Sequence, residues 1–98
     1  MKHPENIRSI EDLKKLIGEL FKDSDVKVYL FGSRARGDHM PFSDVDLAFL
    51  SDEDISGRLT LLREILDESN FPYKVDLVNL KESKELLEVV LREGVRWL

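Results

Sequence analysis

The fold expected for this chain depends on two short stretches, VKVYLFGSRARG (residues 26–37) and SDVDLAFL (residues 43–50). The first is an apolar run followed by Gly32 and Ser33, and the second begins with two aspartates separated by one valine. Apolar runs of this length that are bounded by turn residues are typical of buried strands. The two stretches therefore predict two strands, with a glycine–serine turn after the first and a pair of carboxylates at the start of the second.

The two aspartates are expected to point to the same side of their strand. Residues two apart in an extended chain share a face, so Asp44 and Asp46 project together while Val45, Leu47 and Phe49 project the other way. Two carboxylates about 4 Å apart repel by roughly 4 kcal/mol at an effective dielectric of 20, and a bound cation removes that penalty. Oxygen ligands alone suit Mg²⁺ or Mn²⁺, which take further ligands from substrate phosphates. The pair therefore predicts a metal site that receives a nucleoside triphosphate.

The glycine–serine turn is the expected phosphate site. Gly32 allows the backbone to approach a phosphate closely, and the Ser33 hydroxyl with nearby amides can donate hydrogen bonds if a short helix begins there. Arg34 and Arg36 extend this segment, but two residues so spaced on a short helix cannot face the nucleotide equally, so one of them is expected to contact phosphate. A Gly-Ser turn alone is usually only a turn. His39, in the loop that follows, could touch a phosphate, although loop histidines are more often solvated.

A third carboxylate lies in a later strand-like run. Asp76 stands among the apolar residues of a strand expected over Lys74 to Val78, where an acid is costly to bury unless it is paired or bound to metal. An edge-strand aspartate that faces water is the alternative. Beside the pair Asp44 and Asp46, metal binding is favoured.

The remaining elements follow from periodicity and capping residues. Ser9 and Asp12 fit a capping box for a helix that ends near Asp23, the acidic stretch 51–54 is suited to capping a second long helix, and Gly94 fits the C-terminal cap of a third. Strands are expected over 26–31, 45–50 and 74–78, with a short fourth over 95–98. About a dozen residues connect the first two strands, too few for a full crossover helix. The order predicts an α/β (α+β) fold with a mixed, three- to four-stranded sheet flanked by helices.

Size and composition restrict the function. The 98 residues are expected to form one domain, with no room for a second substrate domain, so an enzyme of this size would take its acceptor from a partner chain. The net charge of -5 and the absence of a long basic run disfavour binding to long nucleic acid. The chain has no cysteine, no secretory signal and no run of transmembrane length, so a cytoplasmic protein without membrane contact is expected. Surplus apolar residues near the C-terminus, including Val89 and Trp97, leave a partner interface or a homodimer open.

Three segments of the chain resemble the minimal nucleotidyltransferases, the MNT domains of the DNA polymerase beta superfamily, in their antitoxin type. These segments are GSRARG (32–37), SDVDL (43–47) and VDL (75–77), and the resemblance spans nearly the whole chain. It implies the nucleotidyltransferase fold, with Gly32 and Ser33 holding the triphosphate. It also implies that Asp44 and Asp46 bind two Mg²⁺ ions, and that Asp76 matches the third acidic position, which helps activate the attacking hydroxyl.

The resemblance also implies an activity. Members of this family are often antitoxins paired with a HEPN-domain toxin, and some transfer AMP from ATP to a tyrosine of that partner. A Mg²⁺-dependent transfer of a nucleoside monophosphate, AMP from ATP, to a hydroxyl of a HEPN-type partner is therefore expected. Two alternatives stay open: a binding module that neutralises its partner by contact alone, and adenylylation of a small molecule of the aminoglycoside kind. The base preference, the acceptor and the oligomeric state are not fixed by the sequence.

Overall fold

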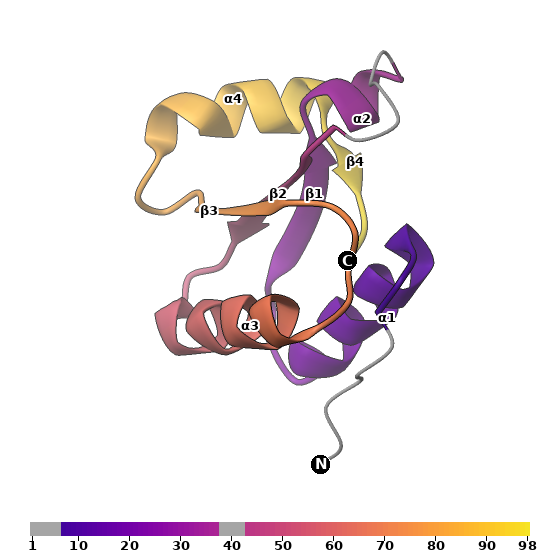
Figure 1. Cartoon of the computed structure of the whole chain (residues 1–98). Helices are drawn as coiled ribbons and strands as arrows, with labels where there is room; N and C mark the ends of the chain where they lie inside the picture. The colour runs from indigo at the N-terminus through magenta and orange to yellow at the C-terminus, as the bar shows by residue number, and fades with distance from the viewer. Residues whose placement is uncertain (1–6, 38–42) are drawn as a thin grey trace.

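The computed structural model describes residues 7–37 and 43–98, and its elements alternate between helices and strands. The sheet has the order β3-β2-β1-β4, in which β1 is antiparallel to both neighbours and β2 is parallel to β3. The mixed four-stranded sheet with flanking helices is therefore confirmed (Figure 1). In chain order the elements are α1 (Ile10–Leu20), β1 (Lys27–Phe31), α2 (Ser33–Arg36), β2 (Val45–Leu50), α3 (Ser56–Glu68), β3 (Val75–Asn79), α4 (Lys84–Glu93) and β4 (Val95–Arg96).

Apolar side chains cover both faces of the central strand β2. Val45, Leu47 and Phe49 are fully buried in the larger core, which they share with residues of α1 and α3. Ala48 points the other way and packs in a smaller cluster with Val90 of α4. Figure 1 shows α1 and α3 on one side of the sheet and α4 on the other. Because side chains alternate along a strand, Asp46 lies on the face that α4 covers.

The capping box of α1 is confirmed, while the expected end of that helix is wrong. The Ser9 hydroxyl accepts a hydrogen bond from the Asp12 amide at 3.1 Å, and the Asp12 carboxylate accepts one from the Ser9 amide at 3.2 Å. Such backbone donors, with that of Arg8 first, lower the pKa of Asp12. The helix ends at Leu20 rather than near Asp23, because Phe21, at the C-cap, leaves the helical conformation with φ -117° and ψ 14°.

Only one acid of the stretch 51–54 contacts the start of α3. The Asp54 carboxylate accepts hydrogen bonds from the Ser56 amide at 3.0 Å and from the Ser56 hydroxyl at 2.7 Å, and these bonds lower its pKa. Ile55 occupies the N-cap position and has no side chain that could cap. Ser51 is buried instead and donates a hydrogen bond to Asp25 at 2.9 Å. The predicted capping role is therefore confirmed for Asp54 alone.

Gly94 is the C-cap residue of α4, as the sequence predicted. It has φ -74° and ψ 152°, the extended conformation that leads directly into β4. A Cβ at this position would lie 2.5 Å from the Val90 carbonyl oxygen, closer than real side chains approach. The glycine therefore allows the chain to pass close to the end of α4.

Apolar side chains also reach the surface near the C-terminus. Leu91, Val95 and Leu98 are 56%, 47% and 36% exposed, whereas Trp97 packs partly against the larger core. In residues 7–37 and 43–98, no helix combines the length and the apolar character needed to cross a membrane.

Two glycine substitutions test the packing at the end of α4. Gly94→Ala places a methyl group against the Val90 carbonyl, so we expect it to lower the free energy of unfolding by about 1–3 kcal/mol. Gly57→Ala, in the first turn of α3 with no atom within 4 Å of the added carbon, should be neutral or raise stability by up to about 1 kcal/mol. Urea denaturation measures both. Equal stability of the two variants would show that the close approach at Gly94 does not exist in solution.

Candidate active site

Two of the predicted site residues lie directly opposite each other on parallel strands. Asp46 of β2 pairs in register with Asp76 of β3, so the two side chains project from the same face of the sheet. Asp46 also lies opposite Phe31, the last residue of β1, which leads into Gly32. Asp44 stands two residues earlier, just before β2 begins. The structure therefore gathers the aspartates where β1 ends and where β2 and β3 begin.

The charges of these aspartates act on one another. The pKa of Asp46 is raised, first by burial, then by the negative charges of Asp76 and Asp44, and finally by a side-chain hydrogen bond with Asp76. A protonated Asp46 can donate that hydrogen bond, which an ionised one cannot. Asp46 is thus the carboxyl at which the repulsion within this group is concentrated.

Asp76 lies at the edge of the sheet and faces water, as one of the two sequence interpretations requires, and metal binding by it stays a prediction. The strand β3 is at the edge of the sheet, and the Asp76 side chain is 46% exposed, as the water-facing alternative requires. Its Oδ1 lies 4.0 Å from Nζ of Lys74, an exposed lysine that directly precedes β3. The same carboxyl also forms the hydrogen bond with Asp46. Asp76 is therefore open to solvent while it belongs to the aspartate group.

Gly32 is in direct contact with this group. It has φ +78°, a backbone conformation that favours glycine, and a Cβ at this position would collide with the Asp46 carboxylate. Its carbonyl oxygen accepts hydrogen bonds from the amides of Ala35 and Arg36, both at 3.2 Å, which forms the short helix α2. Ser33 is the first residue of α2, as the sequence predicted. The glycine is needed here to make room for a carboxylate, which the sequence did not reveal.

The two arginines of the segment have different surroundings. Nε and Nη2 of Arg34 donate hydrogen bonds to the Ser43 carbonyl oxygen at 3.1 and 3.0 Å, and the guanidinium carbon lies 4.4 Å from the centre of the Tyr73 ring. Arg36 is exposed at the end of α2. Contact of either with phosphate stays a prediction. His39 lies outside the described residues.

The carboxyl oxygens of the three aspartates are the candidate donors for a divalent cation. In the part of the chain that the structure describes, no three His, Cys, Asp or Glu side chains converge closely enough to hold a metal ion as they stand. The chemistry of the aspartates fits Mg²⁺, because they offer only oxygen and because a cation would relieve the repulsion that raises the pKa of Asp46. Asp44 is exposed, so its side chain can change rotamer. Metal binding by the three aspartates stays a prediction.

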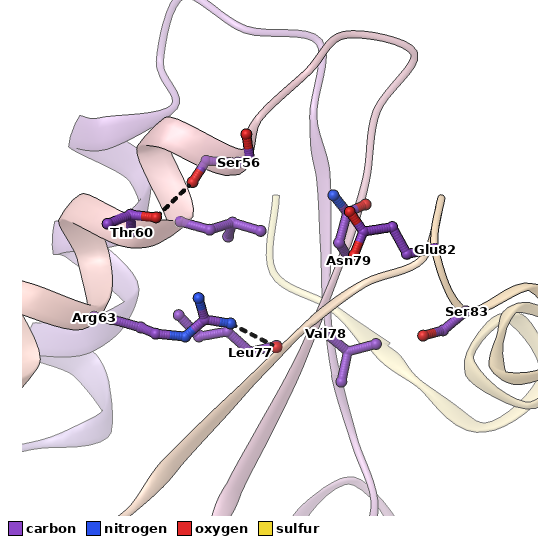
Figure 2. Close-up of a pocket in the computed structure, with 9 residues that line it drawn as sticks. Ser56, Thr60, Arg63, Leu77, Val78, Asn79, Glu82 and Ser83 are labelled. Carbon is purple, nitrogen blue, oxygen red and sulfur yellow. Dashed lines mark hydrogen bonds between the residues drawn. The ribbon is translucent and has the colours of Figure 1, made fainter.

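A pocket of about 280 Å³ lies between α3 and the C-terminal half of β3 and does not include the aspartates. It is on the outer edge of β3, where Arg63 of α3 donates a hydrogen bond to the Leu77 carbonyl at 3.3 Å (Figure 2). Figure 2 also shows the hydrogen bond of the Thr60 hydroxyl to the Ser56 carbonyl, 3.0 Å long, on the wall that α3 forms. The predicted site is therefore separate from this pocket, whose lining residues are Ser56, Leu59, Thr60, Arg63, Leu77, Val78, Asn79, Glu82 and Ser83.

The repulsion at Asp46 has a measurable consequence for stability. Because the pKa of Asp46 is raised in the folded state, that state binds more protons than the unfolded chain, and its stability falls as pH rises through the folded pKa. Without divalent cations, Asp46→Asn removes the repelled charge, so we expect it to raise Tm at pH 7. The increase should be only about 1–3 °C, because the site is partly solvated, and it should disappear towards pH 4, where Asp46 of the parent protein is protonated. Thermal unfolding between pH 4 and 8 tests this. A Tm equal to or below that of the parent protein at pH 7 would contradict it.

The contact between Gly32 and Asp46 can be separated from the cost of the backbone conformation. Gly32 and Gly37 both have positive φ, but only an added Cβ at Gly32 meets another side chain. Gly37→Ala should lower the free energy of unfolding by about 1 kcal/mol through backbone strain alone. Gly32→Ala should cost more and should shift the carboxyl resonance of Asp46. If the two variants behave alike by urea denaturation and by carbon NMR, the close contact is wrong.

Comparisons with known proteins agree with this geometry. The family described as "Polymerase beta, Nucleotidyltransferase" matches residues 14–96. A Haemophilus influenzae protein named "Probable protein adenylyltransferase MntA" is 37% identical over 71 residues, which are 70% of this chain and 61% of that protein. The chain thus spans about three fifths of the length of this curated relative.

Solved structures with the same fold come from toxin–antitoxin complexes. One, the crystal structure of a toxin–antitoxin with AMP-PNP, matches with a TM-score of 0.60 at 29% identity, over 87% of this chain and 72% of that one. Another holds a tri-AMPylated Shewanella oneidensis HEPN toxin in complex with an MNT antitoxin, and matches with a TM-score of 0.56 at 26% identity, over 90% of this chain and 71% of that one. Since the family match includes the turn and all three aspartates, this chain belongs to the polymerase beta nucleotidyltransferase family.

Proposed function

We propose that this chain is a Mg²⁺-dependent nucleotidyltransferase that transfers AMP from ATP to a hydroxyl of a partner protein. The observation that carries the proposal is the pairing of Asp46 with Asp76 on one face of the sheet, with Asp44 and Gly32 next to Asp46. Membership of the nucleotidyltransferase family supports the reaction class. The name of the relative in H. influenzae, a protein adenylyltransferase, supports AMP as the transferred group and a protein as acceptor.

The residues of the site have distinct proposed roles. Asp44, Asp46 and Asp76 hold the divalent cations, for which Mn²⁺ would fit the same oxygen donors. When bound, Mg²⁺ would neutralise the charge that develops on the phosphate oxygens. Gly32 and Ser33 receive the triphosphate through the backbone and the serine hydroxyl. Positioning and charge neutralisation then account for most of the catalysis, and no covalent enzyme intermediate is required.

The transfer itself is a displacement at the α-phosphorus. The acceptor oxygen forms a new bond to that phosphorus, the bond from the phosphorus to the oxygen bridging to the β-phosphate breaks, and pyrophosphate leaves with the bonding electron pair. The hydroxyl proton passes to a carboxylate of the site. Asp76 is the proposed acceptor of the proton, because it is half-exposed at the edge of the sheet, where a side chain of another protein can reach it.

A HEPN-type toxin is the proposed acceptor, and neutralising it is the proposed biological role. Two structural neighbours come from toxin–antitoxin complexes, one with AMP-PNP and one with a tri-AMPylated HEPN toxin, and this supports an antitoxin that acts by AMP transfer. The net charge of -5 argues against long nucleic acid as the acceptor. We place the reaction in the cytoplasm, where ATP and Mg²⁺ are available.

The proposal is tested by mixing the protein with the HEPN-type product of an adjacent gene, ATP and Mg²⁺, and measuring intact masses. The partner should gain the mass of one or more AMP groups, and EDTA should prevent the gain. Asp46→Asn should slow transfer by at least about a hundredfold, because it removes a charged oxygen from the site. Asp67→Asn, which changes an exposed aspartate of α3, is the matched control and should transfer at the parental rate.

The alternative of neutralisation by contact gives the opposite result. If the partner loses toxicity without ATP and without a gain of mass on either chain, the proposed enzyme activity is wrong. Transfer by Asp46→Asn at the parental rate would contradict the catalytic role of the aspartates.

A further inference from the structure

We propose that Arg34 is a positioning residue that joins the glycine–serine turn to the segments directly before both strands that bear aspartates, so that the phosphate site and the metal site keep a fixed relation. This inference rests on the proposed function for its consequence and on observed contacts for its geometry. In this inference the Arg34 guanidinium contacts other groups of the protein. The sequence had left open that it contacts the triphosphate directly.

The first contact joins α2 to the start of β2. Two nitrogens of the Arg34 guanidinium, Nε and Nη2, donate to the single carbonyl oxygen of Ser43 at 3.1 and 3.0 Å. Arg34 directly follows Ser33 of the turn, and Ser43 directly precedes Asp44. A charged donor that reaches a partly buried carbonyl with two hydrogen bonds restricts both position and orientation. The turn and the first aspartate are therefore held at a set separation.

The second contact joins the same guanidinium to the segment before β3. Its carbon lies 4.4 Å from the centre of the Tyr73 ring, within the range of a cation–π interaction. The Tyr73 ring meets Phe71 edge-on, with 5.5 Å between ring centres, and both rings pack partly against the larger core. The residue after Tyr73, Lys74, accepts a hydrogen bond from the Val45 amide at 2.8 Å. Arg34 thus contacts the larger core through Tyr73, and it lies against both chain segments that lead to Asp46 and Asp76.

These contacts require arginine rather than positive charge alone. A lysine has a single ammonium group, which cannot present the planar arrangement that bonds one carbonyl through two nitrogens while it stacks on a ring. A residue whose task is to attract phosphate would be replaced by lysine with a moderate loss. Lysine could not replace a positioning residue of this geometry without a large loss. The two roles therefore predict different results for Arg34→Lys.

The experiment compares four variants by amide hydrogen exchange in the protein without metal. Arg34→Met removes the guanidinium and keeps the length of the side chain, Arg34→Lys keeps the charge, and Tyr73→Leu removes the ring. Arg58→Met is the matched control, because Arg58 also donates to a carbonyl, that of Leu20 at 3.4 Å, and also lies over a ring, at 5.9 Å, but between α3 and α1. Circular dichroism confirms that each variant is folded. If Arg34→Met does not fold, Arg34→Lys replaces it as the test variant.

We expect both Arg34 variants to speed exchange of the Val45 amide, while Arg58→Met leaves it unchanged. Mn²⁺ affinity, measured by calorimetry, should fall about tenfold in Arg34→Met and in Arg34→Lys, as is usual when a residue that orients metal ligands is lost. ATP affinity without divalent cations should change less than Mn²⁺ affinity. The double variant Arg34→Met with Tyr73→Leu should have nearly the same Val45 exchange rate and Mn²⁺ affinity as either single variant, because both substitutions remove the same contact.

Three results would overturn the inference: normal Val45 exchange in Arg34→Met, restoration of Mn²⁺ affinity by Arg34→Lys, or a loss of metal-free ATP binding that exceeds the loss of Mn²⁺ binding. The second would show that positive charge alone suffices at this position, and the third would make Arg34 a phosphate ligand. If the parent protein binds neither Mn²⁺ nor ATP, the proposed function fails, and the exchange rates still decide whether Arg34 joins the segments.

Discussion

The parallel register of β2 and β3 is the constraint on which the site depends, because it places Asp46 directly beside Asp76. Two like charges at neighbouring positions on one face destabilise each other, and burial of Asp46 adds to the cost, as its raised pKa shows. Most sheets avoid such a pair. Here β2 continues beyond Asp46 into apolar residues buried on both faces, and this packing holds the register in spite of the repulsion. A fold that keeps an unfavourable pair at one point is typical of a functional site.

Local patterns predicted most of the elements, while features that depend on distant neighbours were missed. Alternation along residues 45–50 identified β2 and its two faces, the Ser9 and Asp12 pair identified the start of α1, and the short connection after β1 indicated a mixed sheet. The C-cap at Gly94 was predicted correctly, but the close approach of its backbone to the Val90 carbonyl, which requires glycine there, was not.

The site shows the same division between local and distant information. The start of a short helix at Ser33 and the place of Asp76 within a strand could be read from the sequence pattern, and the shared face of Asp44 and Asp46 stays a prediction. The pairing of Asp46 with Asp76 requires the register of two strands that lie far apart in the sequence. The partners of Arg34, a carbonyl and an aromatic ring, could not be predicted from the sequence pattern. Sequence thus identified the chemical groups, and the fold determined how they are held.

Together these contacts describe a site in which the turn, the carboxylates and the joining arginine form one unit at the ends of the strands. We expect the aspartates to share a cation opposite the glycine–serine turn, and the decisive experiment is a crystal structure of the protein with Mg²⁺ and a non-hydrolysable ATP analogue. Metal density should be bounded by carboxylate oxygens of Asp44, Asp46 and Asp76, with the triphosphate against Gly32 and Ser33. Nucleotide bound elsewhere, or Asp76 turned away from the metal, would contradict it.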